Sequence, residues 1–280
     1  MLYAHSFSPI EQSIFRRLSL TESISQFDVN AMTTKMHVDR LKHFNEHKVL
    51  LYSYLQLDYY KHLDTFQLEL DRVELLISYI KEVGFDKIIL LSYPGAYSNS
   101  DNLFLQHKGL IEQMFISSGI QTITLKVQAI YDTYKDINSF HSLFYDRVAH
   151  QYCIPKKSNA MIYSVSMKNM VDVILKSIHY SSATCFDVFD QVSELSVFLS
   201  NHSDGIDVNR LAPVYLYVKS YLGQYSSPTM LELFLRPIVP MHNYRTEKEL
   251  NITLEDEGQI RIMHSNFDRV AQVQRIYGHM

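Results

Sequence analysis

Two histidines are the residues best spaced to bind a metal ion together. His43 and His47 lie four residues apart, which places both on one face of an expected helix over residues 37–47. A zinc site needs further ligands, and the stretch reads His-Phe-Asn-Glu-His, with Glu46 beside His47 and off the shared face. We therefore expect a polar helix face at this place and no metal.

Nucleophilic and phosphate chemistry lack their usual signals. Residues 94–98 read Pro-Gly-Ala-Tyr-Ser, which is not the Gly-x-Ser-x-Gly turn of Ser-His-Asp hydrolases. No glycine-rich turn precedes the lysine of a phosphate-binding loop. Cys153 and Cys185 are the two cysteines, too few for a disulfide framework or a cysteine-rich zinc site. We expect both to be reduced thiols packed in the interior.

Charge and hydropathy narrow the class of partner. The 280 residues carry 26 Lys and Arg against 30 Asp and Glu, a formal net charge of −4, so no basic surplus indicates nucleic-acid binding. No basic amphipathic stripe indicates membrane binding, and no secretory signal is visible at the start. We expect a cytoplasmic protein whose partner is another protein or a small-molecule ligand; a homo-oligomer is compatible with this composition.

The elements that must position any site alternate between short apolar runs and longer amphipathic segments. This alternation is typical of a parallel α/β sheet. Strands are expected at 2–4, 27–30, 48–54, 87–92, 120–125, 162–166 and 185–189. Helices are expected at 10–18, 37–47, 65–83, 103–118, 170–178, 214–222 and 228–235, with an acidic hairpin over 252–262. The glycines at positions 84 and 119 each end a helix just before a strand.

Several of these segments resemble the extended and atypical short-chain dehydrogenase/reductases, including NmrA-like proteins. Residues 84–92, Gly-Phe-Asp-Lys-Ile-Ile-Leu-Leu-Ser, are similar to that family's strand before its catalytic helix. The pattern Lys108 to Glu112, then 118–126 and 130–131, follows the family's order, as does 165–171. The resemblance implies a Rossmann-like doubly wound parallel sheet over 1–160, abridged in its first half. A smaller α+β region with shared strands would follow over 161–280.

The family holds its dinucleotide with glycines between the first strand and helix. The resemblance places those positions at His5, Ser8 and Glu11, none of which is glycine. Side chains there would crowd the turn, and the Glu11 carboxylate would oppose a diphosphate at the helix N-terminus, although it also caps its own helix favourably. Asp28 is the candidate for the acidic residue that binds ribose, or else an ordinary turn aspartate.

The family's chemistry uses a serine, a tyrosine and a lysine, with the tyrosine four residues before the lysine. Lys108 matches the lysine, but Phe104 replaces the tyrosine, so we expect Lys108 to be a solvated helix residue. Ser92 lies where the serine region would be. Tyr93 and Tyr97, on the following loop, are candidates for a relocated acid, or else pack within the loop.

Three departures from the family pattern favour a non-catalytic binding or regulatory protein. They are the missing glycines, the missing tyrosine and the short adenosine-binding half, and they lead us to expect no cofactor. The alternative is an atypical NAD(P)-dependent oxidoreductase or sugar-nucleotide epimerase with a relocated acid. A third interpretation, a subunit of a larger assembly, would use the apolar stretch 228–241.

Overall fold

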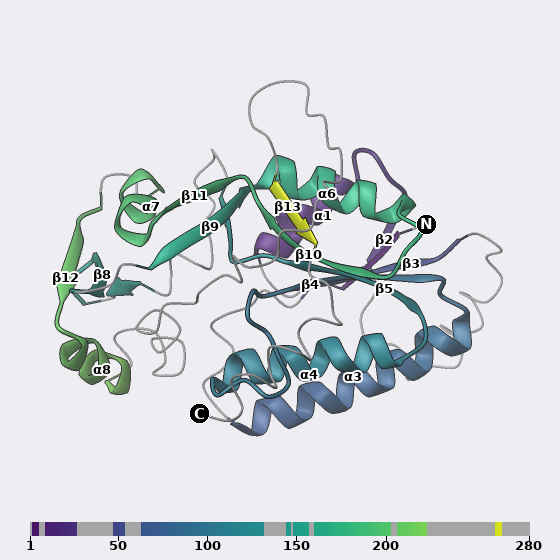
Figure 1. The fold of residues 1–280 in the computed structure, drawn as a ribbon, viewed down its shortest axis with the longest axis horizontal. Coiled ribbons are helices and arrows are strands. Elements are labelled where there is room, and N and C mark those ends of the chain that lie inside the picture. Colours follow the sequence, from purple (N-terminus) through teal and green to yellow (C-terminus); the bar gives the residue numbers. More distant parts are fainter. Residues whose placement is uncertain are drawn as a thin grey trace.

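A central parallel sheet dominates the computed structural model, which describes residues 2–5, 9–26, 47–53, 63–131, 144–146, 148–156, 160–202, 206–222 and 261–264. Seven strands pair in the order β13-β10-β5-β4-β3-β1-β2 (Figure 1). All are parallel except β13, the last of them in the sequence, which is antiparallel to β10. Their bounds are β1 Leu2–His5, β2 Ile24–Gln26, β3 Val49–Ser53, β4 Lys87–Ser92, β5 Gln121–Lys126, β10 Thr184–Phe189 and β13 Arg261–His264.

Helices cover both faces of this sheet, as a doubly wound fold requires. Helices α1 (Pro9–Leu18) and α6 (Met167–His179) lie above the sheet in Figure 1. Helices α3 (Leu63–Val83) and α4 (Leu103–Ser117) lie below it. The expected fold class, a Rossmann-like parallel α/β sheet, is therefore confirmed.

The core divides into two layers because strand side chains alternate between the two faces. Ile88 and Leu90 of β4 belong to the cluster under α3 and α4, together with Phe104 and Phe115 of α4. Ile89 and Leu91 of the same strand belong to the second cluster, under α1 and α6. All six residues of β4 are buried, which explains their continuous apolar run in the sequence.

The ends of helix α4 and its approach to the sheet have local causes. Asn102 caps its N-terminus by accepting hydrogen bonds from the backbone amides of Phe104 and Leu105. Gly119, with φ of +81°, follows its C-terminus in the left-handed conformation that favours glycine. Within the helix, Gly109 contacts the preceding loop so closely that a Cβ would lie 2.1 Å from the carbonyl carbon of Tyr97.

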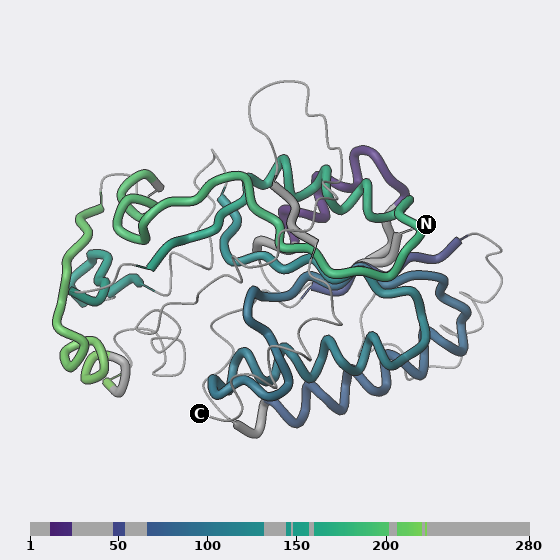
Figure 2. Tube along the Cα trace, viewed as in Figure 1, coloured from purple at the N-terminus to yellow at the C-terminus, as the bar shows by residue number. Residues whose placement is uncertain are grey.

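Beyond the central sheet, the chain builds two smaller three-stranded sheets. One has the order β11-β9-β6, and the other has the order β12-β8-β7. Figure 2 shows the chain running through these sheets away from the central one, toward green α8. Their elements are β6 Ala129–Tyr131, β7 Tyr145–Asp146, β8 Gln151–Pro155, β9 Met161–Ser166, β11 Gln191–Glu194, α7 Leu195–His202, β12 Val208–Leu211 and α8 Pro213–Tyr221.

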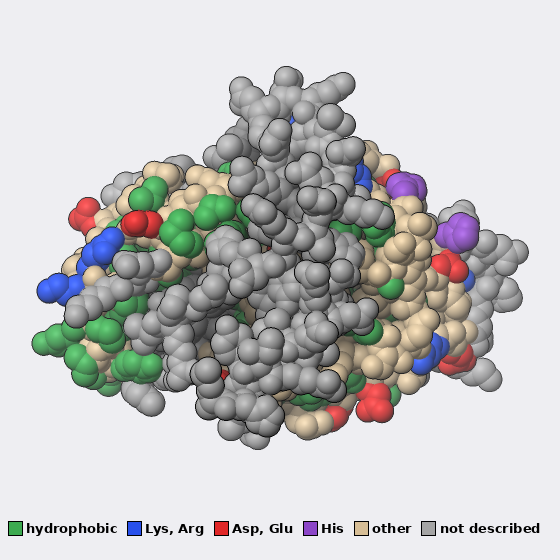
Figure 3. All heavy atoms as spheres, in the orientation of Figure 1, with side chains coloured by type: hydrophobic (Ala, Val, Ile, Leu, Met, Phe, Trp, Pro, Cys, Tyr) green, Lys and Arg blue, Asp and Glu red, His purple; other side chains and the backbone are tan. Residues whose placement is uncertain are grey.

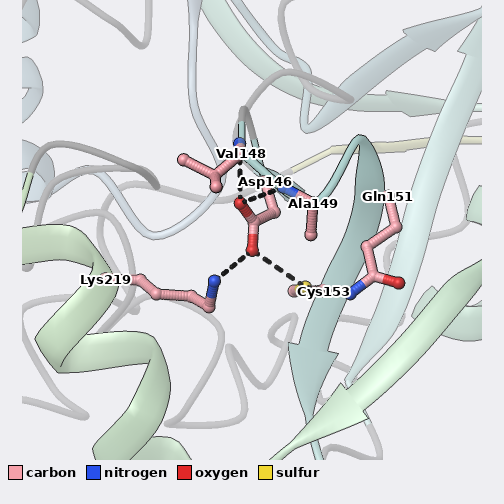
Figure 4. A network of polar contacts seen from close by, with 6 residues as sticks. All are labelled: Asp146, Val148, Ala149, Gln151, Cys153 and Lys219. Carbon is pink, nitrogen blue, oxygen red and sulfur yellow. Dashed lines mark hydrogen bonds and ion pairs between the residues drawn. The ribbon is translucent and has the colours of Figure 1, made fainter.

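Helix α8 is fixed to the outer sheet by one buried carboxylate (Figure 4). Asp146 is fully buried, and one of its oxygens accepts the backbone amides of Val148 and Ala149 at 3.0 Å. The other oxygen accepts a hydrogen bond from Lys219 of α8 at 2.5 Å and lies 3.9 Å from the Cys153 thiol. Both cysteines are buried and reduced, as expected.

The outer face of α8 exposes apolar side chains. Val214, Tyr215, Val218 and Leu222 are each more than half exposed. Figure 3 shows green side chains gathered at the lower left, where Figure 1 places α8. This helix therefore presents to solvent several side chains that a helix of the core would bury.

Several expected elements differ from the structure or lie outside it. The strand expected at 27–30 lies outside the described residues, and a strand is described just before it, at 24–26, beside β1. Of the hairpin expected over 252–262, only residues 261 and 262 are described; they belong to β13, which pairs with β10. The expected elements at 37–46 and 228–235 lie outside the described residues. The abridged first half and the domain boundary at residue 160 stay predictions.

Candidate functional site

Three neighbouring strands each place a polar residue at or near their carboxyl ends. Ser92 of β4 is paired in register with Lys126 of β5, which is paired in register with Asp187 of β10. Neighbouring residues in register project to the same face of a parallel sheet. The face is the one that α4 covers, because the flanking residues Leu125 and Phe186 pack on the opposite side. In open α/β sheets, ligands bind beyond this carboxyl edge.

Helix α4 adds a carboxylate to this group. Glu112 is 4% exposed and accepts a hydrogen bond from the Ser92 hydroxyl at 2.5 Å. Its other oxygen lies 3.3 Å from the Lys126 ammonium, and both side chains are only 6% exposed. Buried charges are stable only when paired and hydrogen-bonded, and here each is.

The loop between β4 and α4 brings Tyr97 onto the same lysine. The Lys126 ammonium donates to the Ala96 carbonyl oxygen at 3.2 Å and lies 4.7 Å from the centre of the Tyr97 ring. That distance is within the range of a cation–π interaction. Tyr97 is partly buried, whereas Lys126 is buried. The backbone of this loop rests directly on Gly109 of α4.

Burial and the neighbouring charges shift the pKa of every titratable group in this cluster. Burial raises the pKa of Glu112 and of Asp187, and the Lys126 charge partly opposes both shifts. Burial alone would lower the pKa of Lys126, but Glu112, together with Cys185, Tyr97 and Asp187, outweighs burial, so the pKa is raised and the ammonium stays protonated. Burial also raises the pKa of Tyr97 to about 12, although Lys126 pulls it down. Tyr97 is therefore a protonated phenol at neutral pH.

The residues predicted as catalytic are divided between this cluster and the core. Ser92 lies in the cluster, with its hydroxyl engaged by Glu112. Tyr93 is 2% exposed and packs edge-on against Phe104 with ring centres 5.4 Å apart. Burial raises the pKa of Tyr93, and the Gln128 side chain partly opposes that shift. Of the two loop tyrosines, Tyr97 is the one that the structure brings onto a charged partner.

The expectation that Lys108 is a solvated helix lysine is wrong. Its side chain is 2% exposed, and its ammonium lies 5.6 Å from the centre of the Phe104 ring. The helix turns this lysine inward because Phe104, Lys108 and Glu112 follow each other at four-residue intervals along one buried face. Apart from the family resemblance, nothing in the sequence pattern indicates a buried charge at position 108.

The predicted cofactor-binding residues are only partly described. The backbone of His5 ends β1 and that of Glu11 lies in the first turn of α1, whereas Ser8 and Asp28 lie outside the described residues. Strand β1 pairs with β2 on one side and β3 on the other, so the sheet order reverses beside it. That reversal is where Rossmann folds bind a dinucleotide. Residues 6–8, which join β1 to α1, lie outside the described residues.

Sequence reasoning missed Glu112, Lys126 and Asp187 as site residues. The signal for Lys126 and Asp187 was a charged residue interrupting or ending an otherwise apolar strand, at the edge where parallel strands end. For Glu112 the signal was a carboxylate four residues after Lys108 on an otherwise apolar helix.

Two other classes of site were sought across the described ranges. No group of three or more His, Cys, Asp or Glu residues within them is placed to hold a metal ion. Within the same ranges, no helix is both long and apolar enough to span a bilayer.

Comparison with known proteins identifies the fold through solved structures. No protein-family profile matches the chain, and no curated protein sequence matches it. The dTDP-4-dehydrorhamnose reductase of Bacillus anthracis, solved with NADP, is similar with a TM-score of 0.57 and 12% identity, over 82% of this chain and 88% of the reductase.

Two other similar structures carry a nucleotide-linked sugar in their name or as a bound ligand. MoeE5, solved with UDP-glucuronic acid and NAD, has a TM-score of 0.56 and 11% identity, over 85% of this chain and 97% of its own. A nucleoside-diphosphate-sugar epimerase of Staphylococcus aureus has a TM-score of 0.54 and 11% identity, over 82% and 86%. At these identities the likeness establishes a shared fold and nothing further.

Proposed function

We propose that this chain is an NAD(P)-dependent reductase of a carbonyl group on a nucleotide-linked sugar, with Tyr97 as the proton donor. The observation that carries the proposal is the position of Tyr97. Its phenol lies on the loop that follows β4, at the carboxyl edge of the sheet, over the buried Lys126 ammonium. The names of the similar structures support the substrate class, since they act on or bind nucleotide-linked sugars with NAD or NADP.

The pKa of Tyr97 leaves a proton on its phenol at neutral pH. A phenol with a pKa of about 12 stays protonated at neutral pH and can donate a proton, whereas it is a poor general base there. When bound, a reduced nicotinamide dinucleotide supplies a hydride for a carbonyl carbon. Tyr97 would give its proton to the carbonyl oxygen, and solvent would return a proton to the phenolate. Lys126 stabilises that phenolate by its charge.

A non-catalytic binding protein is the second candidate. It is favoured by Phe104 at the family's tyrosine position and by the protein-bound hydroxyl of Ser92. Under this hypothesis, the fold binds its ligand without turnover. The two candidates differ in one measurable property, which is oxidation of NADPH or NADH coupled to a sugar nucleotide.

The first experiment measures binding and turnover on the full chain. Calorimetric titration with NADPH and NADH should give micromolar dissociation, about −8 kcal/mol. Oxidation of the bound dinucleotide is then followed at 340 nm with keto-sugar nucleotides as substrates. Heat without turnover would favour the non-catalytic candidate. The absence of both binding heat and turnover would contradict the proposal.

The second experiment separates the two loop tyrosines. Tyr97→Phe should lower kcat by roughly 100-fold or more, because a positioned general acid contributes that much, with dinucleotide affinity unchanged. Tyr93→Phe is the matched control, since Tyr93 is 2% exposed in the core and should retain turnover. Equal activity of Tyr97→Phe and the parent protein would remove Tyr97 from the mechanism.

A further inference from the structure

We infer that Lys126 is the positioning residue for Tyr97, so that the tyrosine–lysine pair of this chain joins a loop to β5 instead of lying along one helix. The inference rests on the proposed function for its catalytic meaning, but its geometry stands independently. It assigns to Lys126 the place that the sequence resemblance gives to Lys108. Lys108 itself lies beside the Phe104 ring, which has no proton to exchange.

The Lys126 ammonium is held in place from several directions. Its strand is paired in register with β4 on one side and β10 on the other. Glu112 and the Ala96 carbonyl oxygen contact the ammonium at 3.3 Å and 3.2 Å. The side chain is 6% exposed, so the ammonium has little room to move. Preorganised charges of this kind act without reorganisation during a reaction.

Glu112 is itself fixed by a residue of the neighbouring strand. The Ser92 hydroxyl donates to one carboxylate oxygen at 2.5 Å, and the other oxygen faces Lys126. The contacts thus run from β4 through α4 and β5 to the loop that carries Tyr97. Ser92 and Glu112 hold the Lys126 ammonium in place, and the Glu112 charge also acts on the phenol directly. All three are therefore positioning residues in this site.

The backbone that carries Tyr97 is held independently of its ring. The close contact with Gly109 leaves no room for a Cβ, and the Ala96 carbonyl oxygen is bound by Lys126. The loop therefore approaches α4 and β5 at the same time. Removing the ammonium should take the cation away from the Tyr97 ring while leaving the contact of the loop with Gly109 in place.

The charges around Tyr97 oppose one another. Lys126 of β5 lowers the pKa of Tyr97, whereas Asp187 and Cys185 of β10 and Glu112 of α4 raise it. Loss of the lysine charge would leave only the groups that disfavour a phenolate. The pKa of Tyr97 should then rise further, and a phenolate formed during turnover would lose its stabilising cation.

The test uses Glu112→Gln as background, because removing Lys126 alone would leave a buried carboxylate without its cation. In that background, Lys126→Met is compared with Lys126 retained, and Lys126→Gln is a second neutral variant in case methionine prevents folding. Lys126→Arg in the natural background keeps the charge and should restore turnover. Circular dichroism and urea unfolding establish that each variant is folded.

The decisive readout does not depend on activity. Difluorotyrosine, whose phenol titrates at lower pH than tyrosine, is placed at position 97 and followed by fluorine NMR. Neutralising Lys126 should raise this pKa by about one unit or more. In turnover assays the same change should lower kcat with KM and dinucleotide affinity unchanged, and Lys126→Arg should reverse the loss.

The possible results separate the two proposals. A titration at position 97 that does not respond to neutralising Lys126 overturns the inference, whatever the turnover. A titration that responds in a protein that neither binds a dinucleotide nor turns over supports the positioning role and rejects the proposed function. A response in both the titration and kcat supports both.

Discussion

His107 is a buried imidazole on α4 that contacts α3. Its side chain is 3% exposed, and its Nε2 lies 3.1 Å from the Phe66 carbonyl oxygen and 3.5 Å from a Glu69 oxygen. The Phe66 ring stacks on it with centres 4.6 Å apart. Burial, reinforced by the charge of Lys108, lowers the pKa of His107 to about 4, because both disfavour a charged ring. The native protein therefore holds this ring neutral at neutral pH.

This residue should make the stability of the fold depend on pH. An unfolded histidine takes up a proton near pH 6.5, whereas the native ring does so only near pH 4. The unfolded state thus binds more protons between these values, and stability is lost as pH falls from 6.5 to 4. The loss should total roughly 3 kcal/mol. Urea unfolding of the parent and of His107→Leu across this range measures it.

The difference between the two proteins isolates His107 from the carboxyl groups that titrate in the same range. The parent should lose stability relative to His107→Leu as the pH falls. His47→Leu provides the comparison with a histidine at the surface, because the His47 side chain is 96% exposed. Parallel profiles for the parent and His107→Leu would contradict the buried neutral state.

At the scale of elements, the contact between α4 and the loop after β4 depends on Gly109. Alanine in a helix interior normally stabilises it over glycine by about 1 kcal/mol. Here a Cβ would lie 2.1 Å from a Tyr97 backbone atom and 2.4 Å from the Ser98 nitrogen, so helix and loop must separate. Gly109→Ala should therefore destabilise the protein by roughly 2 kcal/mol, the opposite sign, and should also lower turnover.

The controls are the glycines at the ends of helices α3 and α4. Gly84 and Gly119 have positive φ and open space around the missing Cβ. Alanine there should cost only about 1 kcal/mol for its left-handed backbone and leave turnover intact. Thermal unfolding of the three variants gives the comparison. A Gly109→Ala protein as stable as the parent would show that the loop can move away from α4 freely.

Sequence periodicity was most informative for the long elements of the central sheet. The apolar run at 87–92 and the glycine-terminated helices predicted β4, α3 and α4 nearly to the residue. Short strands such as β7 and β12 were missed, because two to four residues such as Val208-Asn-Arg-Leu are stabilised by pairing with β8 and carry no period of their own.

The site was less predictable than the fold because it depends on which elements face one another. Polar residues at 92 and 126 could be placed at one edge from the strand order alone. That Glu112 meets Lys126, and that Tyr97 rather than Tyr93 lies over it, depends on the rotation of α4 and the path of one loop. No local pattern in the sequence encodes those relations.

At the scale of the whole molecule, Asp146 and Lys219 join segments 73 residues apart. Lys219→Met would leave the buried Asp146 carboxylate with two backbone amides and the Cys153 thiol as its remaining partners among the contacts in Figure 4. We expect a loss of about 2 kcal/mol, below the range for fully buried pairs because Lys219 is 25% exposed. Urea unfolding measures this loss.

A double-mutant cycle tests whether the two residues act as a pair. Asp146→Asn with Lys219→Met should cost less than the sum of the single changes, since the double variant contains neither buried charge. The pKa of Asp146 is lowered, with Lys219 and the two amides outweighing the effect of burial. Its contribution should hold above the unfolded pKa and disappear as acid protonates it. Strictly additive losses would indicate that the contact stabilises nothing.

Strand β13 pairs antiparallel with β10 through residues 261–264 and covers an edge that would otherwise have unpaired backbone groups. During synthesis, β10 emerges more than 70 residues before its partner. In a nascent or prematurely terminated chain, the backbone amides and carbonyls along this edge of β10 would therefore be exposed to other chains. We expect chains whose translation stops between β10 and β13 to associate with one another through this edge.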